Sequence, residues 1–244
     1  MKLVDKVAVV TGGGRGIGKA IALAFAKEGA SVCITGRTLV DLEETVQEIS
    51  DHGGRAIFAQ GDISVESDIS HFVEFTEQQF GTINILVNNA AINLPDIAIT
   101  EVTLEQWNQI ISVNLTGSFL SCQKVLPIMY RNQTGSVINI SSIGGRHGAK
   151  FRGPYRASKA ALLNLNETLA AEAHEFGVRV NAICPGSVET NMMRQISTDE
   201  SNSMHDWMFP EEIAAVTVFL ASEESSSITG TAIDAFGQSN PLFH

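Results

Sequence analysis

A tyrosine and a lysine stand four residues apart in the segment YRASK, at Tyr155 and Lys159. On a helix this spacing brings both side chains to one face. A free phenol ionises at about pH 10, and a neighbouring ammonium shifts its pKa toward neutrality, where proton transfer is most effective. The pair could therefore act as a general acid or base on a substrate.

Two further polar residues lie in segments that could meet this pair. Ser142 ends the apolar run VINISS shortly before Tyr155, so a strand and the following helix could direct both hydroxyls at one carbonyl oxygen. Asn114 lies in SVNLTG, on the preceding helical segment. Taken alone, each signal also fits a surface Tyr–Lys pair or a buried asparagine, because motifs defined by spacing often match by chance. Together they predict a catalytic group of Asn114, Ser142, Tyr155 and Lys159.

A glycine-rich turn, TGGGRGIG at residues 11–18, joins an apolar run to an amphipathic one. Glycine lets backbone N–H groups come close to a ligand, and the N-terminus of the following helix favours an anion, most often a phosphate. The strict G-x-G-x-x-G fingerprint does not fit, since Ile17 stands where that pattern has its last glycine. The turn alone is a weak indication of nucleotide binding.

Apolar runs alternate with segments of helical period along the chain, and this alternation must position these residues. Strands are expected at 6–10, 31–36, 55–64, 83–90, 135–142, 179–186 and 231–236. Helices are expected at 17–28, 39–51, 66–80, 103–130, 155–176 and 211–221. The pattern predicts an α/β fold with a doubly wound, Rossmann-type parallel sheet. Ligands bind beyond the carboxyl ends of such strands, where the glycine turn stands, so the turn becomes a strong indication of a dinucleotide site.

The composition indicates a globular protein with one domain, residues 1–244, because no linker divides the chain. Its 44% hydrophobic and 18% charged residues exclude a disordered chain. The net charge of -11 argues against a nucleic-acid or anionic-membrane surface. Because neither a signal peptide nor a long apolar run is found, we expect a cytoplasmic location. Cys33, Cys122 and Cys184 lack metal-site spacing, so we expect buried thiols and no metal.

The motifs TGGGRGIG, GDIS, NNAA, SVN, ISS, YRASK and CPGSVET follow one another in this order. In them the chain resembles the short-chain dehydrogenase/reductase family from about Lys6 to Gly230, with a general likeness to its 3-oxoacyl-[acyl-carrier-protein] reductases. The resemblance implies a nicotinamide cofactor, a small carbonyl or alcohol substrate, and a homo-oligomer, either a tetramer or a dimer.

The resemblance also implies a role for each site residue. Ser142 would orient the substrate carbonyl, Tyr155 would transfer the proton, Lys159 would hold the nicotinamide ribose and lower the pKa of the tyrosine, and Asn114 would anchor a relaying water. The expected cofactor-binding residues are Gly12, Gly14, Arg15, Gly16, Ile17, Gly18, Arg37, Asp62, Ile63, Asn88, Ala90, Tyr155, Lys159, Pro185, Gly186, Val188 and Thr190.

The end of the second strand bears on the choice of cofactor. NAD-specific sites place an acid there for the ribose 2′-hydroxyl, whereas here Gly36-Arg37-Thr38 has no acid until Asp41. Arg37 and Arg15 could clamp a 2′-phosphate. We therefore expect NADP(H) and leave NAD(H) open, the alternative being that Arg37 is only a solvated loop residue.

Two segments, the lid and the C-terminal turn, depart from the pattern usual in the family, and a third, a basic loop, contrasts with the acidic chain as a whole. A substrate lid is expected at about 190–210, where methionines and aromatics either suit an apolar substrate or pack the lid. The loop before Tyr155 carries Arg146, His147, Lys150 and Arg152, with Arg156 following, and either attracts an anionic substrate or is solvated. The C-terminal AFGQ replaces the usual closing turn, which leaves the oligomer and the rim of the pocket open.

The motifs together predict an NADP(H)-dependent oxidoreductase that interconverts a carbonyl and a secondary or primary alcohol, with Tyr155 as general acid and base. One alternative is a 3-oxoacyl-[acyl-carrier-protein] reductase, although Ala171 stands where such enzymes often have an arginine. An alternative of another class is a non-catalytic cofactor-sensing or scaffold protein, which would be expected to have lost catalytic positions.

Overall fold

The computed structural model describes residues 1–196 and 207–237. Within them, seven strands form one sheet in the order β3-β2-β1-β4-β5-β6-β7, and every neighbouring pair is parallel. The strands are β1 (Val7–Thr11), β2 (Ser31–Gly36), β3 (Arg55–Gln60), β4 (Ile85–Asn88), β5 (Gly135–Ile140), β6 (Val178–Pro185) and β7 (Ala232–Ala235). Chain order reverses between β1 and β4, which confirms the doubly wound sheet predicted from the sequence.

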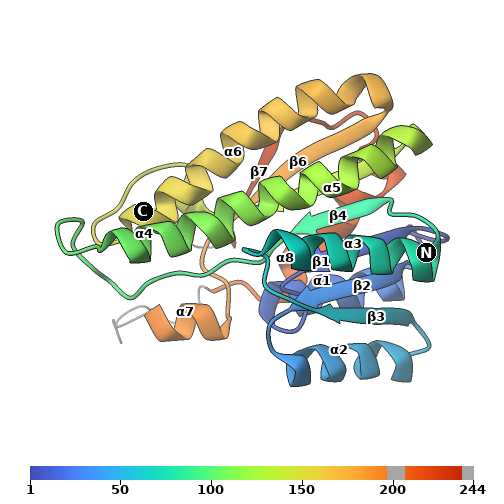
Figure 1. Ribbon diagram of the computed structural model, residues 1–244, viewed down its shortest axis with the longest axis horizontal. Helices are drawn as coiled ribbons and strands as arrows, with labels where there is room; N and C mark the ends of the chain where they lie inside the picture. The colour runs from blue at the N-terminus through green and yellow to red at the C-terminus, as the bar shows by residue number, and fades with distance from the viewer. Residues whose placement is uncertain (197–206, 238–244) are drawn as a thin grey trace.

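Helices cover both faces of this sheet (Figure 1). They are α1 (Gly16–Lys27), α2 (Leu39–Asp51), α3 (Glu66–Phe80), α4 (Leu104–Ile111), α5 (Gly117–Asn132), α6 (Gly153–Ala173), α7 (Asn191–Ile196) and α8 (Pro210–Ala221). One core lies under α1, α2 and α8 and contains Phe25 and Leu42. The other lies under α3, α5 and α6 and contains Phe72 and Met129. Burial on both faces explains the continuous apolar strands.

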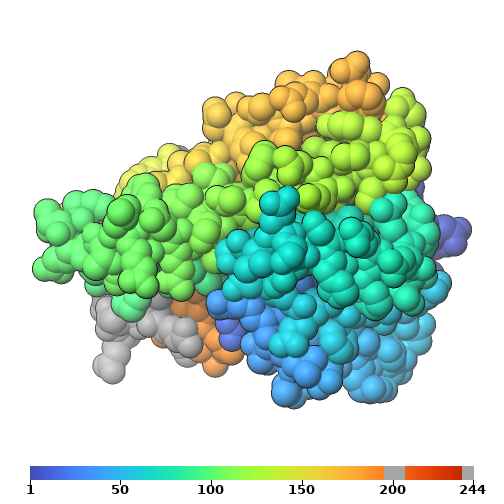
Figure 2. Space-filling model, viewed as in Figure 1, coloured from blue at the N-terminus to red at the C-terminus, as the bar shows by residue number. Residues whose placement is uncertain are grey.

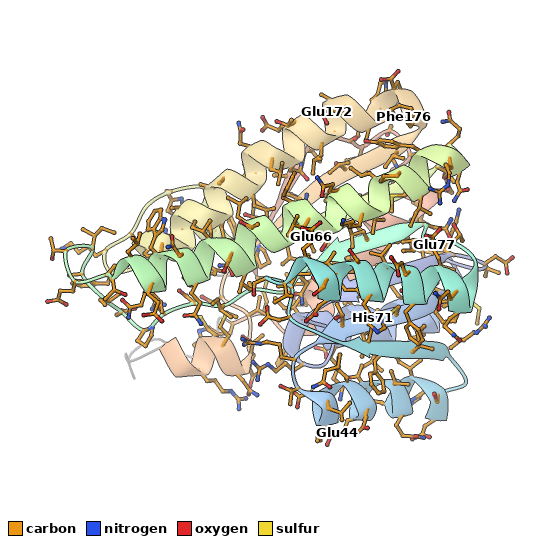
Figure 3. All side chains as sticks on the ribbon, viewed as in Figure 1. Glu44, Glu66, His71, Glu77, Glu172 and Phe176 are labelled. Carbon is orange, nitrogen blue, oxygen red and sulfur yellow. The ribbon has the colours of Figure 1, made fainter. Side chains whose placement is uncertain are left out.

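The face shown in Figure 2 is formed largely by α3, α5 and α6, with α2 along its lower edge. Lys124 and Arg131 on α5 pair with Glu66 and Glu77 on α3, at 2.9 and 3.1 Å, and Figure 3 labels both glutamates. Exposed pairs of this kind contribute at most about 1 kcal/mol each. The apolar cores therefore hold the layers together.

The structure differs from several predicted boundaries, and two of the differences have a clear physical cause. The helix expected at 103–130 is divided into α4 and α5 by a π-helical turn at Ser112–Thr116, which contains Asn114. At its end Gly117 packs against the backbone of Ile63, where a Cβ atom would lie 2.6 Å from the carbonyl oxygen. The strand expected to reach residue 64 ends at Gln60 because Asp62 accepts hydrogen bonds from Ser64 and forms a turn.

Other predictions concern cysteines, metals and membranes. The three cysteines are buried free thiols, and burial raises the pKa of Cys33 to about 11 and that of Cys122 to about 12. Within residues 1–196 and 207–237, no His, Cys, Asp and Glu side chains gather in a group that could bind a metal ion. The helices of these same residues include none long and apolar enough to cross a bilayer.

Candidate active site

A cavity of about 620 Å³ lies at the carboxyl edge of the sheet and joins the glycine turn to the segment YRASK. Its lining includes most of the residues predicted from the sequence: Gly12, Gly14, Arg15, Gly16, Ile17, Arg37, Asp62, Ile63, Ala90, Ser142, Tyr155, Lys159, Pro185, Gly186, Val188 and Thr190. Gly18, Asn88 and Asn114 do not line it. Tertiary structure thus brings residues from distant segments to one site.

The glycine turn is shaped for a close ligand. Gly12 and Gly16 have positive φ angles of +67° and +54°, which L side chains rarely adopt. A Cβ atom at Gly18 would lie 2.1 Å from the carbonyl oxygen of Gly12, so glycine at this position lets α1 pack closely against the turn. Helix α1 begins here without a side-chain cap and without an acid in its first turn. Its uncapped N–H groups suit a phosphate, and the turn fits the pyrophosphate of a dinucleotide.

The two asparagines at the end of β4, Asn88 within the strand and Asn89 just after it, have different positions. Asn88 is buried, and its amide donates to Asn139 Oδ1 at 2.9 Å. Asn89 lines the cavity and donates to the carbonyl oxygens of Thr11 and Gly12 at 2.9 and 3.2 Å. The adenosine-side position expected for Asn88 is therefore not seen, because successive residues of a strand point to opposite faces. Asn89 supports the glycine turn, a role that the sequence reasoning missed although NNAA had been singled out.

Asn114 is fully buried and fixes the loop after β4. Its Oδ1 accepts from the backbone N–H of Ile92 at 2.8 Å, and its Nδ2 donates to the Ile92 carbonyl at 3.0 Å and to Ser158 Oγ at 3.1 Å. Ser158 in turn donates to the Tyr155 carbonyl at 2.7 Å. The side chain of Asn114 thus connects the π-helical turn to the loop after β4 and to α6.

Ser142, Tyr155 and Lys159 meet where β5 ends and α6 begins. A point built as a Cβ on Gly144 lies 3.4 Å from Ser142 Oγ and 3.6 Å from Tyr155 Cε1, so both side chains surround one small volume. The Lys159 ammonium lies 5.9 Å from the centroid of the Tyr155 ring and donates to the Ile140 carbonyl at 2.7 Å. Three members of the predicted group therefore lie close together, and the lysine among them is buried.

The resemblance implied a lowered pKa for Tyr155, whereas in the structure its pKa is raised. Burial raises the pKa of Tyr155 above its ordinary value, and the opposing effects of a hydrogen bond with Ser142 and of the charges on Arg156 and Arg152 do not cancel the rise. Burial also lowers the pKa of Lys159 from 10.5 to about 8. Desolvation disfavours both charged forms, so the phenol is protonated at neutral pH and the lysine is mostly charged.

The opposite end of the cavity follows β2 and β3. Arg37 lies 3.7 Å from Asp62, and Arg15 is exposed at the glycine turn. Burial alone would raise the pKa of Asp62, but hydrogen bonds from Ser64 and the neighbouring Arg37 outweigh it and lower the pKa. Asp41 packs on Gly14, where a Cβ atom would lie 2.9 Å from that of the aspartate. Two guanidiniums therefore line this end together with two carboxylates.

The predicted lid at about 190–210 is described in part. Met192 and Met193 of α7 line the cavity. Met208 is buried in the core beneath α8, whereas Phe209 is exposed. Met204 lies outside the described residues, as do 197–206 and the end of the C-terminal tail from residue 238. The soft side chains thus divide between the pocket wall and core packing.

The basic residues on either side of Tyr155 also lie in two different places. Arg146 pairs with Asp234 at 2.8 Å, on the outer surface. Arg152 and Arg156 line the cavity beside Tyr155, and Arg152 pairs with Asp96 at 2.6 Å. The sequence signal for these two arginines was their place on either side of Tyr155.

Comparison with known proteins agrees with this geometry. Residues 6–201 match the family described as short chain dehydrogenase. The chain is 35% identical to glucose 1-dehydrogenase 2 of Bacillus subtilis, over 95% of this chain and 93% of that protein. It is 36% identical to the 3-oxoacyl-[acyl-carrier-protein] reductase FabG of Chlamydia muridarum, over 96% and 97%. The crystal structure of levodione reductase superposes with a TM-score of 0.91, at 29% identity and 96% coverage of both chains.

Proposed function

Because the chain belongs to the short-chain dehydrogenase family, we propose that this oxidoreductase uses NADP(H) to interconvert a carbonyl group and a secondary or primary alcohol, with Tyr155 as general acid and base. The observation that supports this most is the shared cavity. Ser142, Tyr155 and Lys159 line the same 620 Å³ space as the uncapped glycine turn.

A nicotinamide cofactor bound in this cavity would supply or accept the hydride at the reacting carbon. Ser142 donates a hydrogen bond to the carbonyl oxygen and holds it beside Tyr155. In the direction of reduction, the phenol gives its proton to that oxygen as the hydride arrives at carbon, and the reverse transfer serves oxidation. A phenol is already protonated at neutral pH, and the raised pKa of Tyr155 acts in the same direction.

Lys159 and Asn114 support the tyrosine in this proposal. The lysine, whose pKa is about 8, carries its charge in most molecules at pH 7 and would hold the nicotinamide ribose. Charge on the ammonium favours the phenolate left after proton transfer. Asn114 fixes the loop at Ile92 and, through Ser158, the turn of α6 that carries Tyr155.

The preference for NADP(H) rests on the end of the cavity near β2. Arg15 and Arg37 both line it, and residues 36–38 contain no acid that would hold a ribose 2′-hydroxyl. Asp62 lies against Arg37 and orients its guanidinium, leaving further N–H donors for a 2′-phosphate. Asp41 lies at the turn and would oppose that phosphate, so the two arginines must outweigh it.

We extend the proposal to one domain over residues 1–244 with a lid at about 190–210, and to a cytoplasmic homo-oligomer. Met192 and Met193 in the cavity wall support the lid, and the family resemblance supports the assembly. A second candidate reaction, reduction of a 3-oxoacyl thioester on a carrier protein, is favoured by the likeness to the chlamydial reductase.

The test is nicotinamide absorbance with NADPH and with NADH against ketones, diketones, keto-sugars and a 3-oxoacyl thioester, for the natural protein and Tyr155→Phe. We expect turnover with NADPH that falls at least about 100-fold in the variant, since general acid–base catalysis contributes that much. Equal turnover by the variant would refute the role of Tyr155, and faster turnover with NADH would refute the cofactor preference. Tight NADPH binding without turnover of any substrate would instead favour a cofactor sensor.

A further inference from the structure

The side of the cavity nearest Tyr155 carries a cation that the proposed reaction does not use. Arg156 follows Tyr155 on α6 and lines the cavity. A point built as a Cβ on Gly144 lies 3.0 Å from Arg156 Cγ, and the same point lies within 3.6 Å of both Ser142 Oγ and Tyr155 Cε1. The stem of Arg156 therefore lies close to the side chains of Ser142 and Tyr155, and all three residues line the same cavity.

The charge of Arg156 is poorly compensated. Its Nη1 donates to the His147 carbonyl at 2.6 Å, but among the residues that the structure describes no carboxylate lies within 4.0 Å of its guanidinium. The side chain is half-buried. Burial and the neighbouring charge of Arg152 lower the pKa of Arg156. A half-buried cation without a counter-ion costs free energy that an anionic ligand would recover.

None of the acids that line the described cavity wall is a counter-ion for Arg156. Asp62 lies at the far end beside Arg37, and Asp41 packs on the glycine turn. Glu189 pairs with Arg194. Arg152, whose own partner is Asp96, adds a second positive charge beside Tyr155. The described walls around the catalytic tyrosine are thus cationic although the whole chain carries a net charge of -11.

We propose that the substrate carries a carboxylate close to its reacting carbonyl, and that Arg156 binds this carboxylate. The inference rests on the proposed function and names its substrate class: small oxo acids and the corresponding hydroxy acids. A guanidinium and a carboxylate are both planar and match in two parallel hydrogen bonds, which would fix the carbonyl relative to Ser142 and Tyr155. Arg156 is then a specificity-determining residue, and Arg152 strengthens the positive field.

The experiment compares pyruvate, acetoacetate and levulinate with their methyl esters, using NADPH and the natural protein, Arg156→Met and Arg156→Lys. Lys150→Met is the matched control, because it removes an exposed positive charge of the same loop that does not line the cavity. We expect at least one acid to be preferred over its ester. Its kcat/KM should fall by about 10- to 100-fold in Arg156→Met, with partial recovery in Arg156→Lys, while the ester changes less than about threefold.

Three outcomes would overturn the inference. The natural protein would reduce the esters as well as the acids, or Arg156→Met would lower both equally, which indicates a structural role. In the third outcome, dihydroxyacetone phosphate is preferred over dihydroxyacetone, this preference depends on Arg156, and none of the acids shows such a preference. The anionic group of the substrate would then be a phosphate.

A binding measurement separates this inference from the proposed reaction. Levulinate is titrated calorimetrically into the protein saturated with NADP⁺, in parallel for Arg156→Met and Lys150→Met. Binding that weakens at least about tenfold only in the Arg156 variant supports the carboxylate site even if no substrate is turned over. If reduction of neutral ketones is seen but levulinate does not bind, the proposed function stands and the carboxylate site is refuted.

Discussion

Lys159 offers a prediction in which structure, charge and pH can be measured together. Its ammonium is buried and donates to the Ile140 carbonyl, and burial lowers its pKa from 10.5 to about 8. Between these two pH values the unfolded chain binds more protons than the folded one, so the free energy of unfolding rises with pH. Below about pH 8 the cost of burying the charge is present in full.

The size of this cost follows from the two pKa values. A lowering from 10.5 to about 8 corresponds to about 3 kcal/mol, of which about 2 kcal/mol is recovered between pH 7 and pH 9.5. Lys159→Met keeps most of the length of the side chain and removes the charge. It also removes the hydrogen bond to Ile140, worth about 1 to 3 kcal/mol, at every pH. The stability of the natural protein relative to the variant should therefore rise by about 2 kcal/mol over this range.

The assay is urea denaturation at pH 7, 8, 8.75 and 9.5, followed by circular dichroism without nicotinamide cofactor. Lys150→Met, which removes an exposed lysine, is the control and should follow the natural protein. Equal pH dependence of the natural protein and Lys159→Met would refute the reasoning, because the buried amine would then titrate as it does in the unfolded chain.

Two further predictions concern cofactor binding. Gly18→Ala should weaken NADPH binding at least about tenfold and lower stability by about 1 to 3 kcal/mol, because its Cβ atom would lie 2.1 Å from a backbone oxygen of the glycine turn. Gly148→Ala, where the added atom meets nothing within 4 Å, should leave both unchanged, and fluorescence titration distinguishes the two. Arg37→Asp should lower the ratio of kcat/KM for NADPH over NADH by about 10- to 100-fold, since it replaces a phosphate partner by an acid at the end of β2. An unchanged ratio would show that Arg37 contacts no phosphate.

The sheet could be predicted from the sequence because burial pattern and strand length are local properties. Runs such as KVAVV and SVCITG are apolar on both faces, and they became β1 and β2 with only small changes at their ends. The break at Ser112–Thr116 could not be predicted in the same way. A single wide turn hardly changes the helical period, and its cause lies in contacts of Asn114 and Gly117 with distant loops.

The site was predictable where a residue follows a strand or repeats a helical spacing, as Ser142, Tyr155 and Lys159 do. It was not predictable where a shift of one residue along the chain changes the face of the sheet to which a side chain points. Asn88 and Asn89 are identical in type and adjacent, yet one lies among buried asparagines and the other supports the glycine turn. The surroundings of Tyr155 were not predictable either, because its burial and the charges of Arg156 and Arg152 near it depend on loops packed around α6.

The sequence by itself determined the parallel sheet, its ligand-binding edge and the residue types that could transfer a proton, since periodicity and glycine placement act over a few neighbouring residues. Only the tertiary structure decided that burial raises the pKa of Tyr155, that it lowers the pKa of Lys159 to about 8, and that Arg156 is left without a carboxylate partner among the described residues. These properties depend on desolvation and on charges brought together from distant segments, which no local pattern records.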